Sequence, residues 1–108
     1  MSADFWVSLE PPSNGSHIVR VGGELDLAVA GQLREVLAHL DGHVRIDCKE
    51  LSFVDASGIG VLVGAAARLD SLRLVNVAAQ PLRVFELAGT QFLHEVPSTQ
   101  EVQDAHSL

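Results

Sequence analysis

Two hydrophobic periodicities alternate along this 108-residue chain, and the alternation restricts the fold more than any other feature. Apolar residues at every second position are typical of strands, whereas apolar residues at i, i+4, i+7 and i+8 indicate amphipathic helices. Strands that alternate with helices form right-handed crossovers and a mainly parallel sheet. The sequence therefore predicts a single α/β domain over residues 1–108, with a mixed, mostly parallel β-sheet, an N-terminal hairpin and about four helices.

Turn residues between the periodic segments fix the expected order of the elements. Residues 11–16 combine proline, serine, asparagine and glycine, which is typical of a turn between two antiparallel strands. Strands are expected at 4–9, 17–22, 44–48, 72–77 and 92–96, with 51–54 leading out of the third. Helices are expected at 28–40, 57–69, 81–88 and from 98 onward.

Capping residues mark the expected helix ends. Asp26 is placed as the N-cap or first-turn acid of the first helix. Pro81 suits the first position of the third helix, and Gly89 the position just after its end. Ser98 and Glu101 form a capping box that opens a short terminal helix.

Composition excludes several classes of function. The formal net charge of −7 argues against nucleic-acid binding and against docking on anionic lipid, and it favours a partner surface of basic character. The lone Cys48 is interpreted as a buried structural thiol, because no second cysteine or Cys/His cluster accompanies it. No transmembrane-length apolar stretch or signal peptide is found, so a cytoplasmic protein with no membrane contact is expected.

The junction at residues 55–58 (Asp-Ala-Ser-Gly) carries the strongest functional signal. A strand ending at Val54 runs directly into a helical pattern, which puts the Ser57 hydroxyl at a helix N-terminus beside the Asp55 carboxylate. Helix N-termini accommodate phosphate, and the carboxyl ends of strands are where open α/β sheets meet ligands. The sequence therefore predicts that Ser57 is a switch residue.

The two sides of the helix at 57–69 differ in composition. One side is expected to pack on the sheet: Ile59, Leu62, Val63, Ala66 and Leu69. The opposite side is small and nearly uncharged: Ser57, Gly60, Val61, Gly64, Ala65 and Arg68. Glycine inside a helix costs roughly 1 kcal/mol relative to alanine, so Gly60 and Gly64 need a reason. Either a partner approaches closely there, or another part of the same domain covers this side.

The residues around Ser57 resemble the signature of STAS domains, and more closely that of bacterial anti-sigma-factor antagonists. The signature is Phe53-Val54-Asp55-Ala56-Ser57-Gly58-Ile59-Gly60. Four further landmarks follow the same order as in that family: Gly23-Glu24-Leu25-Asp26, Leu51, Leu74-Val75-Asn76 and Phe85-Glu86-Leu87-Ala88-Gly89. Two positions depart from the pattern. Ala56 replaces a frequent second hydroxyl residue, and Val29 replaces a frequent threonine, which puts the capping of the first helix in question.

The resemblance implies a phosphorylation-controlled antagonist. Such a protein binds an anti-sigma factor that is also a serine kinase of the histidine-kinase-like ATPase type, and binding frees the sigma factor. The kinase phosphorylates the serine that matches Ser57, and a PP2C-type phosphatase restores the active form. The expected partner-binding residues are Asp26, Asp55, Ser57, Gly58, Gly60, Val61, Gly64 and Arg68. No catalytic residue, metal or cofactor is expected.

Alternative interpretations of the same residues remain open from the sequence. Ser57 as a catalytic nucleophile needs a base, and none of the five histidines stands in a motif with it. The Gly-x-Ser-x-Gly elbow is absent, the glycine spacing is wrong for a dinucleotide, and there is no Walker lysine. Ser57 could instead be an unmodified N-cap. The second functional hypothesis is a non-switching STAS scaffold or adaptor module of a signalling or transport complex.

Overall fold

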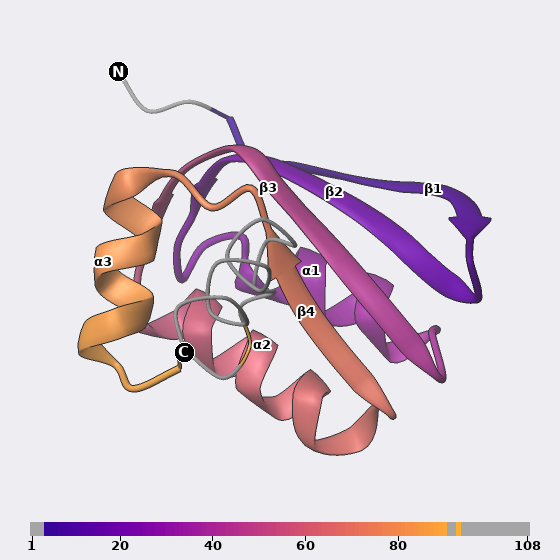
Figure 1. Ribbon diagram of the computed structural model, residues 1–108. Helices are drawn as coiled ribbons and strands as arrows, with labels where there is room; N and C mark the ends of the chain where they lie inside the picture. The colour runs from indigo at the N-terminus through magenta and orange to yellow at the C-terminus, as the bar shows by residue number, and fades with distance from the viewer. Residues whose placement is uncertain (1–3, 91–92, 94–108) are drawn as a thin grey trace, which may run out of the picture.

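A four-stranded mixed sheet carries the fold of this computed structural model, which describes residues 4–90 and Leu93 (Figure 1). The strands are β1 (Trp6–Ser13), β2 (Ser16–Leu25), β3 (His43–Val54) and β4 (Ser71–Val75), in that spatial order. β1 pairs antiparallel with β2, whereas β2 and β3 and then β3 and β4 pair in parallel. The predicted α/β class, the mostly parallel sheet and the N-terminal hairpin are confirmed.

Three helices occur among the described residues: α1 (Ala30–Ala38), α2 (Ala56–Arg68) and α3 (Ala79–Leu87). Figure 1 shows α1 and α2 side by side behind the sheet, and α3 at the side of the molecule, where it packs against β3. The predicted fourth helix from residue 98 lies outside the described residues. So does most of the strand predicted at 92–96.

The core lies between the sheet and helices α1 and α2. Alternate residues of the inner strands point into it, as period-two patterning requires. Leu33 and Leu37 of α1 and Ile59 and Leu62 of α2 pack onto them. The buried apolar strand residues are Val19, Val21, Leu25, Val44, Ile46, Cys48, Leu51, Val54, Leu72 and Leu74.

The hairpin turn is narrower than the sequence predicts. Only Asn14 and Gly15 form the turn, with φ of 52° and 81°, as a two-residue type I′ connection requires. Pro11 and Pro12 belong to β1 instead. β1 is an edge strand, where a missing N–H leaves no ladder partner unsatisfied, and its register shifts between Glu10 and Ser13.

Strand β3 is longer than predicted. The segments 44–48 and 51–54 belong to one continuous strand, whose register against β2 shifts once between Asp47 and Glu50 and again between Leu51 and Phe53. These shifts are bulge-type irregularities that bend a strand without ending it.

All three helix starts differ from the prediction, that of α2 by one residue, because α2 begins at Ala56 rather than 57. α1 begins at Ala30 rather than 28, and its N-cap is Val29, which makes no side-chain hydrogen bond. Asp26 is therefore not the cap. α3 begins at Ala79, so Pro81 is its third residue and not its first. Proline is tolerated there because the first-turn N–H groups have no partner within the helix. Gly89 follows α3 with φ of 76° and is confirmed at its predicted position.

Candidate functional site

The ends of β2 and β3 and the start of α2 meet at one edge of the sheet. Leu25 pairs with Val54 at the ends of these parallel strands, and the Asp55 N–H donates to the Leu25 carbonyl at 3.2 Å. The Gln80 side chain of α3 accepts a hydrogen bond from the Val54 N–H at 3.3 Å. Elements far apart in the sequence thus converge on the predicted Ser57 junction, at the carboxyl ends of the parallel strands.

Asp55 is the N-cap of α2. Its Oδ1 accepts the Ser57 N–H at 2.9 Å and the Gly58 N–H at 3.3 Å, and its carbonyl accepts the Ile59 N–H at 3.1 Å. The interpretation of Ser57 as the N-cap is therefore wrong, because an aspartate two residues earlier already satisfies the free N–H groups.

Ser57 is the second residue of α2 and is half-buried. No residue within 4–90, nor Leu93, makes a hydrogen bond to its hydroxyl. Modification of the hydroxyl would therefore break no hydrogen bond to these residues.

Asp26 stabilises the turn that leads from β2 into α1. Its Oδ1 accepts the Ala28 N–H at 3.0 Å, and its carbonyl accepts the N–H groups of Val29 and Ala30. This turn starts one residue after Leu25, which is bonded to Asp55, so Asp26 lies on the same edge of the sheet as the Ser57 junction.

Leu27 is a surface residue of this edge that the sequence reasoning did not select. Its side chain is 78% exposed, in contrast to the buried apolar residues of α1. The available signal was an apolar residue that lies directly after Asp26 and outside the helical stripe that begins at Val29. A single exposed leucine is common on protein surfaces, so it is the place of Leu27 beside Asp26, rather than its exposure alone, that makes it a candidate contact.

Gly58 lies in the interior rather than on the surface. A Cβ at this position would lie 2.6 Å from Leu25 Cγ and 2.8 Å from Val54 Cγ2, closer than atoms can approach. The glycine therefore permits α2 to start directly against the ends of β2 and β3. Gly58 was expected to contact the partner, but it is buried and offers no exposed surface for such a contact.

The two sides of α2 differ from the prediction at two valines. Val61 was expected on the open side but is 5% exposed, and Val63 was expected on the sheet but is 38% exposed. The reason is that α1 packs beside α2 and covers the side that carries Val61 and Ala65. Part of the predicted open side is therefore covered by the same domain.

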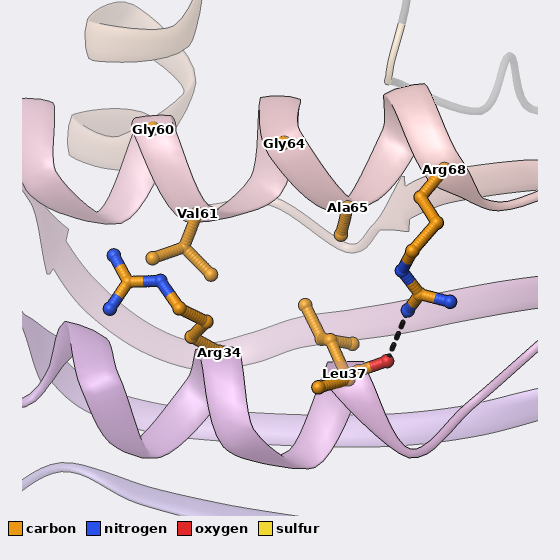
Figure 2. A pocket seen from close by; sticks show the side chains of 8 residues that line it. Arg34, Leu37, Gly60, Val61, Gly64, Ala65 and Arg68 are labelled. Carbon is orange, nitrogen blue, oxygen red and sulfur yellow. Dashed lines mark hydrogen bonds between the residues drawn. The ribbon is translucent and has the colours of Figure 1, made fainter.

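Gly60 and Gly64 remain exposed, and apart from the adjacent residues and the helix's own backbone no atom lies within 4 Å of where a Cβ would stand. Arg68 bends across to α1. Its Nη2 donates to the Leu37 carbonyl at 2.6 Å (Figure 2). Its Nη1 donates to Asp41 Oδ1 at 3.3 Å. Arg68 thus joins the end of α2 to the end of α1.

A groove of about 210 Å³ runs between α1 and α2. Figure 2 shows Val61 and Ala65 of α2 facing Leu37 of α1 across it, with the arginines Arg34 and Arg68 toward its two ends. The eight lining residues are Arg34, Leu37, Ala38, Gly60, Val61, Gly64, Ala65 and Arg68.

A metal site, a membrane-spanning helix and a reactive thiol are all absent from the described residues. No cluster of three or more His, Cys, Asp or Glu residues that could hold a metal occurs there, and none of the helices described has the length and apolarity to cross a membrane. Cys48 is buried. Burial, and secondarily the Asp47 carboxylate, raises the pKa of its thiol to about 12, which keeps it protonated and unreactive.

Comparisons with known proteins identify the family of the chain. A family model described as Mlab, STAS domain, matches residues 12–94. The anti-sigma-B factor antagonists of Bacillus subtilis and Staphylococcus aureus are 31% and 32% identical over 90 and 93 residues, which is 77% and 79% of this chain and 83% and 86% of theirs.

Solved structures share the fold at lower identity. The unphosphorylated form of the anti-sigma factor antagonist SpoIIAA aligns with a TM-score of 0.64 and 21% identity, over 95% of this chain and 98% of that one. An anti-sigma factor antagonist from Mycobacterium paratuberculosis aligns with a TM-score of 0.76 and 19% identity, over 94% and 93%. The family match over most of the sequence and this common fold lead to one conclusion: the chain belongs to the STAS domain family.

Proposed function

We propose that this chain is a bacterial anti-sigma-factor antagonist whose binding is switched off by phosphorylation of Ser57. The curated relatives bear the name antagonist, and SpoIIAA has been solved in both unphosphorylated and phosphorylated forms. The observation that carries the proposal in this chain is the Ser57 hydroxyl, which has no hydrogen-bond partner among the described residues and stands beside a capped helix start.

The proposed partner is an anti-sigma factor of the histidine-kinase-like ATPase type, which also acts as the serine kinase. Its binding surface on this chain centres on Ser57, with Asp26, Asp55 and the exposed Leu27 on the same edge of the sheet. The two carboxylates favour a basic surface on the partner, and Leu27 adds apolar area. A PP2C-type phosphatase would return the protein to its binding form. The role is regulatory rather than enzymatic and belongs in the cytoplasm.

Phosphorylation at Ser57 would act locally. A phosphate adds roughly −1.5 to −2 charges at neutral pH. The carboxylate of Asp55 already accepts the N–H groups of Ser57 and Gly58, so the phosphate would stand beside a second negative group. The helix dipole tolerates an anion in its first turn, which preserves the fold. At an interface the same charge must be desolvated and repels acidic neighbours, so the complex would dissociate.

The test is phosphate transfer from purified kinases of this type from the same genome. Wild type should take up one phosphate, and Ser57→Ala should take up none while it remains folded. Ser52→Ala is the matched control, because Ser52 is an exposed serine on the preceding strand and bonds to the Gly23 carbonyl. Undiminished labelling of folded Ser57→Ala would refute Ser57 as the phosphorylation site.

A further inference from the structure

The groove between α1 and α2 combines an apolar wall with two arginines, of which, within the described residues, only Arg68 is held by hydrogen bonds. Leu37, Val61 and Ala65 supply apolar surface. Arg68 is held in place by the Leu37 carbonyl and by Asp41. Arg34 is exposed, and no residue in the described part of the chain pairs with it. Arg34 is therefore the cation that remains available to a group entering the groove.

The size of the groove selects its occupant. Sites for whole cofactors and drug-sized molecules measure about 300–1,000 Å³. At about 210 Å³ this groove is smaller, and it suits side chains presented by another protein. The arginines beside the groove also favour one sign of charge in the group that enters it. Two of the chain's seven basic residues flank this groove, although the chain as a whole carries a net charge of −7. An acidic group is favoured here, and a basic one is repelled.

The glycines of α2 give access to the groove. Gly60 and Gly64 line it, and neither has an atom within 4 Å of its missing Cβ. Two glycines in a helix interior cost stability and relieve no clash within this domain. Longer side chains would stand at the groove mouth. The open mouth, the apolar wall and an arginine with no partner among the described residues are the features of a pocket that receives a side chain.

We infer that this groove receives an apolar side chain with a neighbouring carboxylate from the anti-sigma factor, and that Arg34 pairs with that carboxylate. The inference rests on the proposed function and extends it, because it places a second contact along α2, away from Ser57. The contact is opposite in charge to the acidic edge formed by Asp26 and Asp55, so a partner must present basic and acidic groups in the matching order.

The experiment measures calorimetric affinity of full-length variants for histidine-kinase-like anti-sigma factors purified from the same genome. Arg34→Glu places a repelling charge at the groove, and Gly64→Leu places a bulky side chain at its mouth, where the added Cβ meets open space. Each should weaken binding by about tenfold or more. The control is Arg83→Glu, which makes the same charge change at an exposed position on α3 and should leave affinity within about twofold. Circular dichroism confirms the folding of each variant.

The outcomes separate the two proposals. If wild type binds, Ser57→Asp weakens binding, and folded Arg34→Glu and Gly64→Leu bind as tightly as Arg83→Glu, the groove inference is wrong while the proposed function stands. If Arg34→Glu and Arg83→Glu weaken binding equally, the effect is one of net charge and the groove inference also fails. If wild type binds none of these kinases, the proposed function and the inference that rests on it both fail.

Discussion

At the scale of single residues, capping of α2 is divided unequally between Asp55 and Ser57, because the Asp55 side chain alone accepts the free N–H groups. Asp55 satisfies the N–H groups at the start of α2, which leaves the Ser57 hydroxyl without a structural task among the described residues. A serine that capped the helix would have to give up that bond to be modified. We therefore expect modification of Ser57 to cost little stability.

This division predicts unequal effects on the free energy of unfolding. Asp55→Ala should lower it by about 0.5–2 kcal/mol, because the N-cap is lost, whereas Asp55→Asn should keep most of it. Ser57→Ala should change it by less than about 0.5 kcal/mol. Urea denaturation of the three variants measures the differences. A loss in Ser57→Ala as large as that in Asp55→Ala would show that the serine, too, holds the helix start.

Cys48 gives a pH dependence of known sign. Burial raises the pKa of its thiol from 9.0 to about 12. In the unfolded chain the thiol loses its proton near pH 9, while the folded protein keeps it. Because the folded state binds more protons above pH 9, stability should fall from about pH 9 to about pH 12, with a slope approaching 1.4 kcal/mol per pH unit.

The measurement compares wild type with Cys48→Ala by urea denaturation between pH 8 and pH 11. The alanine variant lacks the thiol contribution, so the difference between the two proteins should change only above about pH 9. Iodoacetamide should label the native thiol far more slowly than the thiol of the urea-unfolded chain. Equal labelling rates would mean that Cys48 is not buried in solution.

At the scale of elements, α2 contains glycines of two kinds. Gly58 is an interior residue whose Cβ would overlap Leu25 and Val54, whereas Gly60 and Gly64 have free space around them. Gly58→Ala should destabilise the protein by about 1–3 kcal/mol through overpacking. Gly60→Ala and Gly64→Ala should each stabilise it by up to about 1 kcal/mol, because alanine is the better helix former.

Thermal or urea unfolding of the three alanine variants tests this difference within a single helix. The comparison is internally matched, since the substitution and the element are the same. Destabilisation by Gly64→Ala comparable to that by Gly58→Ala would contradict the open space at Gly64. It would also mean that Gly64 is needed for packing within the domain rather than for access to the groove between α1 and α2.

The elements themselves follow well from local sequence, and their details follow less well. The alternation of periods predicts β2, β3, β4 and all three described helices, because each has a buried face repeating at its own period. The burial of Val61 and the exposure of Val63 could not be predicted, since both depend on how closely α1 lies beside α2. The capping role of Asp55 was within reach, because aspartate before a helical pattern is a favoured N-cap.

At the scale of the whole molecule, the candidate site exists only once the sheet is assembled. Residues 25–27 and 55–58 come together because β2 and β3 run in parallel and end at the same edge. The family motif pointed to Ser57 and Asp55 directly. The exposure of Leu27 and the groove between α1 and α2 depend on tertiary packing and are invisible to periodicity.

The whole fold also bears on what phosphorylation can do. The core of the sheet and helices α1 and α2 is formed by apolar residues that are buried beneath the surface. A charge added to the half-buried second residue of α2 does not enter that core. The expected consequence is a change in binding with an unchanged fold.

The most direct test measures, on one sample phosphorylated at Ser57, both the affinity for the kinase partner and the far-UV circular dichroism. The account predicts a native spectrum with affinity lowered at least a hundredfold, which corresponds to about 2.7 kcal/mol. Ser57→Asp should show the same change less completely. Unchanged or tighter binding by the phosphorylated protein would contradict the switch and favour a scaffold role, and lost binding together with a lost native spectrum would contradict the local mechanism.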